Sequence, residues 1–167
     1  PIETQSSWGW LPVTSVTAAS GVWLLSQCYI QARSASSWAV PLFWIGLVTL
    51  FAPIIARFSA RDVSRREGVG MILALAVGVY LGSYLRSPLL FSRFDEFLHW
   101  RTAYDILRTQ HFFTPNSLLP VSPLYPGLES ATTALVSLTG LSIFEAGVLV
   151  IGTCHLHKLL GLYLLFE

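Results

Sequence analysis

The chain has 167 residues, of which 53% are hydrophobic and only 11% are charged. Soluble domains carry about 25% charged residues because their surface must be hydrated, so this chain has too few charged groups for a water-soluble globule. The composition predicts a protein whose main solvent is lipid, and it excludes a secreted disulfide scaffold, a cytosolic enzyme domain and a disordered regulator. The formal net charge of +1 gives no indication of an acidic partner.

The first 86 residues predict three membrane-spanning helices, at about 11–32, 38–56 and 68–85. Each segment approaches the ~20 apolar residues that a helix needs to cross the hydrocarbon core of a bilayer. The loop at 57–67, between the second and third segments, holds four of the ten Lys and Arg residues. Basic loops stay on the cytoplasmic side of a membrane, so the chain after residue 85 is expected on the outer face.

A fourth apolar segment, 141–167, predicts one more span, which His155, His157 and Lys158 interrupt. In one interpretation Lys158 lies near the inner interface, where its long side chain reaches the head groups. In the other, Lys158 and His155 face a cavity and bind an anionic, lipid-linked group. Because the chain begins at Pro1 without a Met and stops without a polar tail, we expect it to be part of a longer polytopic protein.

Residues 87–140 form a predicted extracytoplasmic loop, too long for a turn and too polar to span a membrane. Apolar residues at helical spacing predict an amphipathic helix at 94–109 that lies along the membrane surface. Four prolines between 111 and 126 exclude helix and favour an extended path. A second short helix is expected at 127–139. The predicted fold is therefore an all-α, polytopic membrane protein with two juxtamembrane helices in a long outer loop.

Two adjacent carboxylates, Asp95 and Glu96, begin the first of these helices. Acidic residues in a first turn are favoured by the helix dipole, so in one interpretation they cap the helix and pair with Arg93. In the other, desolvation at the lipid–water boundary raises the pKa of one carboxyl group, which accepts a proton from a substrate hydroxyl. With His99 one turn later, the pair also has ligands for a divalent cation such as Mg²⁺ or Mn²⁺.

The candidate substrate-binding residues are His99, Arg93, Arg101 and Tyr125. Arg93 lies at the outer membrane boundary, where it either reaches the head groups or binds a phosphate. Arg101 stands four residues before Asp105, a spacing that favours an ion pair within the helix. The Arg residues of 57–67 are explained by membrane topology, so nothing indicates nucleic-acid binding.

Around Asp95 the sequence resembles the protein O-mannosyltransferases and the wider C-type glycosyltransferase superfamily. The residues that carry the resemblance are Phe94 to His99, Tyr104, Phe112, Phe113 and the following Pro-rich segment. Members of that superfamily have an Asp-Glu or Asp-Asp pair after a transmembrane helix, then two juxtamembrane helices with a Pro-containing link and a second transmembrane helix. The resemblance covers about 69–166.

The resemblance implies transfer of a sugar from a polyprenyl-phosphate donor to an acceptor glycan, lipid or protein, with inversion at the anomeric carbon. It implies that Asp95 is the general base and that Glu96 is a supporting or metal-facing carboxylate. The Pro-rich segment lacks the His-Pro-Pro of the protein mannosyltransferases, and two spans precede the matching helix, so a divergent bacterial membrane glycosyltransferase is the closer likeness. Later helices generally complete the donor site in such enzymes, so this piece alone is expected to be inactive.

Two other classes of function are open at this point. A transporter or flippase would use His155, His157 and Lys158 along a pathway, with the outer loop as a gate, although only the fourth segment carries such a cluster. In a non-catalytic assembly subunit, Asp95 and Glu96 would only cap a helix. In every case the chain is expected to be integral to the cell membrane, in contact with lipid, and the enzyme's active face would be extracytoplasmic.

Overall fold

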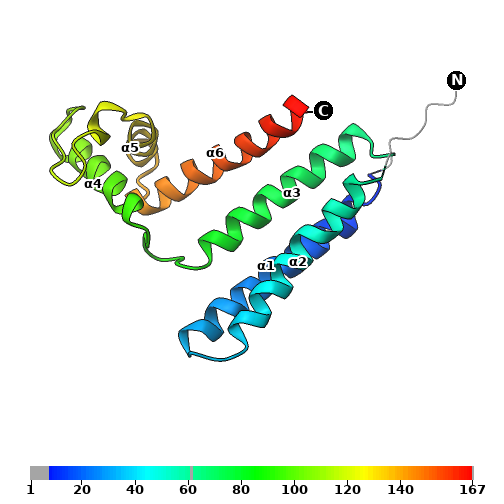
Figure 1. Ribbon diagram of the computed structural model, residues 1–167. Coiled ribbons are helices and arrows are strands. Elements are labelled where there is room, and N and C mark those ends of the chain that lie inside the picture. The colour runs from blue at the N-terminus through cyan, green and yellow to red at the C-terminus, as the bar shows by residue number, and fades with distance from the viewer. Residues whose placement is uncertain (1–7, 61, 167) are drawn as a thin grey trace, which may run out of the picture. The chain divides into compact units, whose positions relative to one another are not determined.

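The computed structural model describes residues 8–60 and 62–166 (Figure 1). Within these residues the chain forms six α-helices and one short 3-10 helix, without a strand, so the predicted all-α class is confirmed. The helices are α1 (Leu11–Arg33), α2 (Ala39–Phe58), α3 (Arg65–Tyr84), α4 (Phe94–Thr109), the 3-10 helix η1 (Ser122–Leu124), α5 (Gly127–Thr139) and α6 (Ile143–Phe166). Pro1, Glu167 and Arg61, which is one of the four basic residues counted at 57–67, lie outside the described residues.

Three of the described helices, α2, α3 and α6, are long and apolar enough to cross a membrane. The helix α1 has 23 residues, which is also sufficient length, but polar side chains such as Thr14, Ser20 and Gln27 make it less apolar. A membrane-associated chain with several spans is therefore supported, and the first of the four predicted spans stays a prediction.

The basic segment predicted as a loop at 57–67 is shorter in the structure, because α2 continues to Phe58 and α3 begins at Arg65. Ser64 is the N-cap of α3, and its Oγ accepts a hydrogen bond from the backbone N–H of Glu67 at 3.3 Å. Such a cap satisfies one of the amides that a helix start leaves unpaired. Arg57 and Glu67, expected in the loop, therefore lie in the last turn of α2 and the first turn of α3.

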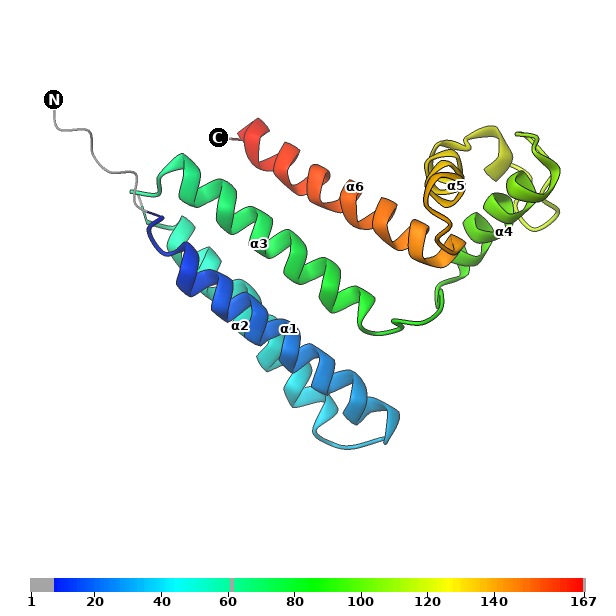
Figure 2. The same cartoon turned by 180° about the vertical axis from the view of Figure 1, so that it is seen from behind.

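The described chain divides into two compact units. The first comprises α1, α2, α3 and the part of α6 from His155 on, and the second runs from Ser87 to Cys154. In the second unit, α4 packs against α5 and against η1 (Figure 2). This second unit corresponds to the outer loop of the sequence analysis together with the beginning of α6.

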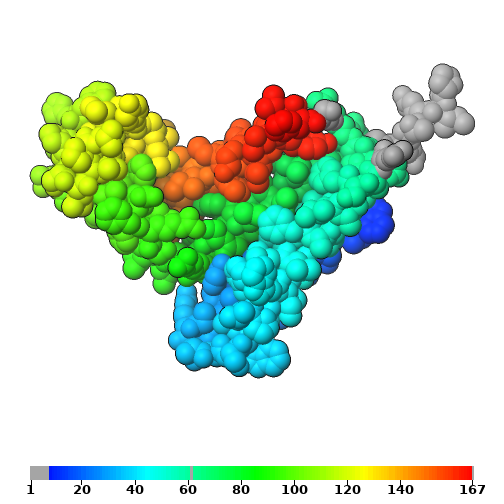
Figure 3. All heavy atoms as spheres, viewed as in Figure 1, coloured from blue at the N-terminus to red at the C-terminus, as the bar shows by residue number. Residues whose placement is uncertain are grey.

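In the first unit, α1 and α2 pack closely along their length around Ala18, Leu25 and Leu50. The close approach depends on Gly21, where an added Cβ would lie 2.9 Å from the carbonyl oxygen of Gly46 and 2.9 Å from the backbone nitrogen of Leu50. In the space-filling view, α2 in cyan covers much of α1 in blue (Figure 3). Small residues at such crossings are typical of helices that pack in membranes.

A buried ion pair joins the ends of α1, α2 and α3. The Arg57 guanidinium donates to both carboxylate oxygens of Glu67, at 2.7 Å from Nε to Oε1 and 2.9 Å from Nη2 to Oε2. Glu67 also accepts a hydrogen bond from the backbone N–H of Trp10, which precedes α1, at 2.8 Å. Arg57 further donates to the exposed Asp62 carboxylate at 2.8 Å, and this contact holds the pKa of Asp62 below its ordinary value.

We predict that Gly21→Ala lowers the thermal stability of the protein in lipid nanodiscs. The added methyl group would meet backbone atoms that cannot move aside, and such overpacking costs about 1–3 kcal/mol. Gly161→Ala is the matched control, since an added Cβ there meets nothing within 4 Å. Equal melting temperatures for the two variants would contradict this account of the helix contact.

A second prediction concerns Glu67→Gln, which removes the negative charge that faces Arg57 but keeps an oxygen for the Trp10 amide. Because Glu67 is only 2% exposed, the Arg57 cation loses its buried counter-ion, and we expect a large fall in melting temperature. Asp62→Asn is the control, and its effect should be several times smaller because the Asp62 side chain is 82% exposed. Falls of similar size in both variants would assign the stabilisation to the surface contact instead.

Candidate functional site

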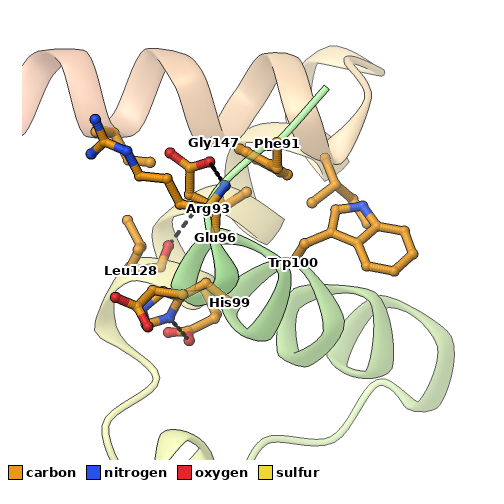
Figure 4. A pocket seen from close by; sticks show the side chains of 12 residues that line it. Phe91, Arg93, Glu96, His99, Trp100, Leu128 and Gly147 are labelled. Carbon is orange, nitrogen blue, oxygen red and sulfur yellow. Dashed lines mark hydrogen bonds and ion pairs between the residues drawn. The ribbon is translucent and has the colours of Figure 1, made fainter. Parts of the chain in front are cut away.

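A pocket of about 230 Å³ lies within the second unit, between α4, α5 and the start of α6 (Figure 4). Its polar lining consists of Arg93, Asp95, Glu96, His99, Glu129 and Thr132. Apolar side chains, including Phe91, Leu128 and Ile143, form the rest of the wall. A concave, mostly apolar pocket with a few convergent polar groups is the usual form of a small-ligand site.

Glu96 has a structural role at the start of α4. Its Oε2 accepts hydrogen bonds from the backbone N–H groups of Ser92 and Arg93, each at 2.9 Å. Those amides would otherwise be unpaired at the helix start, and the negative charge is also favoured there by the helix dipole. For Glu96, the helix-capping part of the sequence interpretation is confirmed, and the ion pair with Arg93 stays a prediction.

Asp95, the neighbouring carboxylate, is placed differently. Its side chain is exposed and lines the pocket, and no hydrogen bond or ion pair with another residue is found for it in the described part of the chain. Glu96 therefore caps the helix, while the carboxylate of Asp95 stays available to a ligand. The adjacent acids, equivalent in the sequence, are distinct in the structure.

The most buried ionisable group of the pocket is Glu129, in the first turn of α5. Its side chain is 1% exposed, and its Oε1 lies 2.7 Å from Nδ1 of His99, whose side chain is 43% exposed. Its second oxygen, Oε2, is buried and has no hydrogen-bond partner among the described residues. Figure 4 shows His99 and Leu128 on one side of the pocket and Trp100 extending on the other.

Sequence reasoning missed Glu129. The only local signal was an acidic residue in the first turn of the second juxtamembrane helix, which the helix dipole alone would explain. Its partner His99 is 30 residues away, and only the path of the Pro-rich segment brings the two together.

A chain of buried hydrogen bonds connects Glu129 to the Pro-rich segment and to α4. Ser122 Oγ donates to Glu129 Oε1 at 3.4 Å and lies 3.3 Å from Thr102 Oγ1. Thr102 Oγ1 in turn accepts from Asn116 Nδ2 at 3.1 Å, and Asn116 Oδ1 accepts from the backbone amides of Leu118 and Leu119. The network thus fixes the Pro-rich segment against α4 and α5.

The Pro-rich segment differs in one respect from the extended path that its prolines predict. Residues Ser122–Leu124 form a turn of 3-10 helix, with Pro123 among its first positions. Proline is compatible with a helical first turn because its missing N–H would be unpaired there in any case. The turn directs the Ser122 hydroxyl toward Glu129.

The other candidate residues have separate positions. Arg101 forms the expected ion pair with Asp105, at 2.8 Å from Nε to Oδ2, and does not line the pocket. Tyr125 is 77% exposed and also lies outside the lining, whereas Arg93 and His99 belong to it. Of the predicted site residues, the structure therefore brings together Arg93, Asp95, Glu96 and His99.

Within the described residues, no three side chains of His, Cys, Asp or Glu are arranged to hold a metal ion. One oxygen of Glu96 is already bonded to two backbone amides. A Mg²⁺ or Mn²⁺ site at Asp95 and Glu96 stays a prediction, and further ligands would have to come from other groups.

The polar cluster of α6 belongs to the first unit. The His155 ring lies 6.2 Å from the ring of Tyr80, measured between centroids, and Lys158 is exposed. A transport pathway along these residues stays a prediction.

The chain matches no protein-family model, no curated protein and no solved structure.

We predict that Asn116→Ala loosens the Pro-rich segment. Asn116 is 4% exposed and is the acceptor for two backbone amides, and leaving such groups unpaired costs about 1–3 kcal/mol. Amide hydrogen exchange at Leu118 and Leu119 should become faster, and the melting temperature should fall. The neighbouring Ser117→Ala, at an exposed position, should change neither quantity. Unchanged exchange in Asn116→Ala would show that the segment is held by other contacts.

Proposed function

We propose that the chain is the membrane part of a glycosyltransferase that transfers a sugar from a polyprenyl-phosphate donor to an acceptor on the extracytoplasmic face. The observation that carries the proposal is the placement of Asp95. Its carboxylate lines a pocket with a His–Glu pair and is not bonded to another described residue. The resemblance of 94–99 and the Pro-rich segment to C-type glycosyltransferases supports the same assignment.

The proposed reaction needs one proton acceptor at the attacking group. The acceptor hydroxyl forms a bond to the anomeric carbon while the bond from that carbon to the phosphate oxygen breaks, so the configuration inverts. Asp95 takes the hydroxyl proton, and the polyprenyl phosphate leaves with the bonding electrons. A positioned base of this kind contributes about 10²–10⁴-fold to a rate.

The exposed surface of α4 supports a location at the membrane interface. One side of the helix is buried in the protein through Leu98, Ala103 and Ile106. Another side exposes large apolar residues in a stripe, Phe94, Phe97, Trp100 and Tyr104. Apolar and aromatic side chains on an exposed helix face are typical of helices that lie in the interfacial plane. A lipid-linked donor would be met at that depth.

The remaining topology belongs to the same proposal. We place α1 in the membrane as a fourth span, with the segment between α2 and α3 on the cytoplasmic side and the pocket on the outer side of the cell membrane. Nucleotide sugars are not available outside the cell, so a donor carried by membrane lipid is the consistent choice. The acceptor is a glycan, a lipid or a protein.

The test is sugar transfer by the full-length protein in membranes, with mannose, glucose and arabinose linked to polyprenyl phosphate as donors. Asp95→Asn should lower turnover by about 10²–10⁴-fold, because the amide cannot take the proton. Asp95→Glu should retain part of the activity, according to how well the longer side chain reaches the hydroxyl.

Glu145→Gln is the matched control, since Glu145 caps α6 through Ser142 and does not line the pocket. Turnover should remain at the level of the unmodified protein. Full turnover in a well-folded Asp95→Asn protein would rule out Asp95 as the general base. If Asp95→Asn lowers the stability of the protein but leaves its turnover normal, the result would favour an assembly subunit in which Asp95 has no chemical role.

A further inference from the structure

The His99–Glu129 pair is the feature of the pocket that the proposed function does not use. Glu129 is almost completely buried, yet neither of its oxygens accepts a hydrogen bond from the backbone of its own helix. An acidic residue needed only for the helix dipole would be equally effective at the surface. Burying a carboxylate is costly, so we expect Glu129 to have a role that depends on its contact with His99.

Glu129 determines which nitrogen of His99 faces the pocket. With a carboxylate oxygen 2.7 Å from Nδ1, that nitrogen carries the proton, because two acceptors would repel each other. Nε2 is then the nitrogen left for a ligand, and it has no hydrogen-bond partner among the described residues. His99 is 43% exposed and lines the pocket, so Nε2 is the accessible end of a rigidly oriented ring.

The charges around the pocket restrict what can bind there. Three carboxylates, Asp95, Glu96 and Glu129, line it against the single guanidinium of Arg93. A phosphate or another anion would be repelled even if His99 were protonated. A neutral ligand that donates hydrogen bonds is compatible with the same surroundings, and the apolar wall can contact its carbon atoms.

Asp95 and His99 also stand one helical turn apart on α4, so both side chains face the same space. A ligand that reaches both needs two hydrogen-bond donors close together. A single hydroxyl satisfies one of them, whereas a sugar ring with neighbouring hydroxyl groups satisfies both. The pocket, at about 230 Å³, is below the ~300–1,000 Å³ of sites for drug-sized ligands, so one ring is a suitable occupant.

We infer that the pocket binds a saccharide, with one hydroxyl directed to Asp95 and a neighbouring hydroxyl donating to His99 Nε2, and that Glu129 is the positioning residue that fixes the His99 ring. The inference rests on the proposed function only where this saccharide is identified as the acceptor of glycosyl transfer. It therefore favours a glycan acceptor, or a sugar carried by a lipid, over the isolated hydroxyl of a Ser or Thr side chain.

The first experiment measures ligand binding without turnover. Diethyl pyrocarbonate modifies accessible, unprotonated imidazole nitrogens, and peptide mapping by mass spectrometry gives the rate at each His of the full-length protein in nanodiscs. The probes, added separately, are the methyl glycosides of glucose, mannose, galactose and arabinose, ethanolamine as a cation, and inorganic phosphate. The exposed His111 is the internal reference for consumption of the reagent.

At least one glycoside should slow modification of His99 several-fold and saturably relative to His111. Glu129→Leu should abolish this protection, and Glu129→Gln, which retains an oxygen for Nδ1–H, should restore part of it. Glu145→Leu is the matched control and should leave it intact. Protection by phosphate or ethanolamine alone, protection that persists in Glu129→Leu, or no protection by any probe would each overturn the inference.

The second experiment tests whether His99 binds the saccharide or accepts the proton in the transfer reaction. In the transfer assay, His99→Gln should raise KM for the acceptor by about tenfold, as expected for one lost hydrogen bond, with little change in kcat. A loss of kcat as large as that of Asp95→Asn would make His99 the base and refute its holding role. Protection of His99 by a glycoside, combined with full turnover in Asp95→Asn, would retain the saccharide site and reject the proposed catalytic step.

Discussion

A carboxylate that is removed from water needs a partner, and this constraint shapes both units of the protein. In the first unit Glu67 is paired with Arg57, and the pair connects the start of α1, the end of α2 and the start of α3. In the second unit Glu129 is paired with His99, and the pair joins α5 to α4. Glu67 and Glu129 are therefore points where separate helices meet, whereas the buried Asp105 pairs with Arg101 of its own helix.

The two pairs differ in whether all of their hydrogen-bonding atoms have partners. The Arg57 guanidinium meets Glu67 with two hydrogen bonds, and the backbone of Trp10 adds a third, so the carboxylate is fully engaged and its role is structural. Glu129 has one oxygen bonded to His99 and one without a partner among the described residues, and the His99 ring is partly exposed. The partly exposed His99 ring of the second pair lines the pocket of the candidate site, whereas the Glu67 carboxylate is 2% exposed and has both oxygens bonded to Arg57.

Local sequence signals predicted the elements of the second unit well. The helices at 94–109 and 127–139 agree with α4 and α5 to the residue, because an acidic first turn, flanking prolines and Gly140 mark their ends. The pairing of Glu129 with His99 could not be predicted, since it depends on the path of 110–126, which the buried Asn116 and Ser122 fix. Arg57 was likewise expected in a loop, whereas α2 continues to Phe58 and Arg57 pairs with Glu67 of α3. Local patterns specify where helices begin and end, whereas long-range pairs require the fold.

The separation of Asp95 from Glu96 follows from helix geometry. Residues at successive positions of a helix point about 100° apart, so the carboxylates of Asp95 and Glu96 have different surroundings. Glu96, at the third helical position, reaches back to the amides before the helix, and the backbone neutralises part of its charge. Asp95 points to the side where His99 follows one turn later, and both face the pocket. Asp95 and His99 lie on the face of α4 that continues through the buried Thr102 and Ile106, so the packing of that face against α5 and η1 directs both residues toward the pocket.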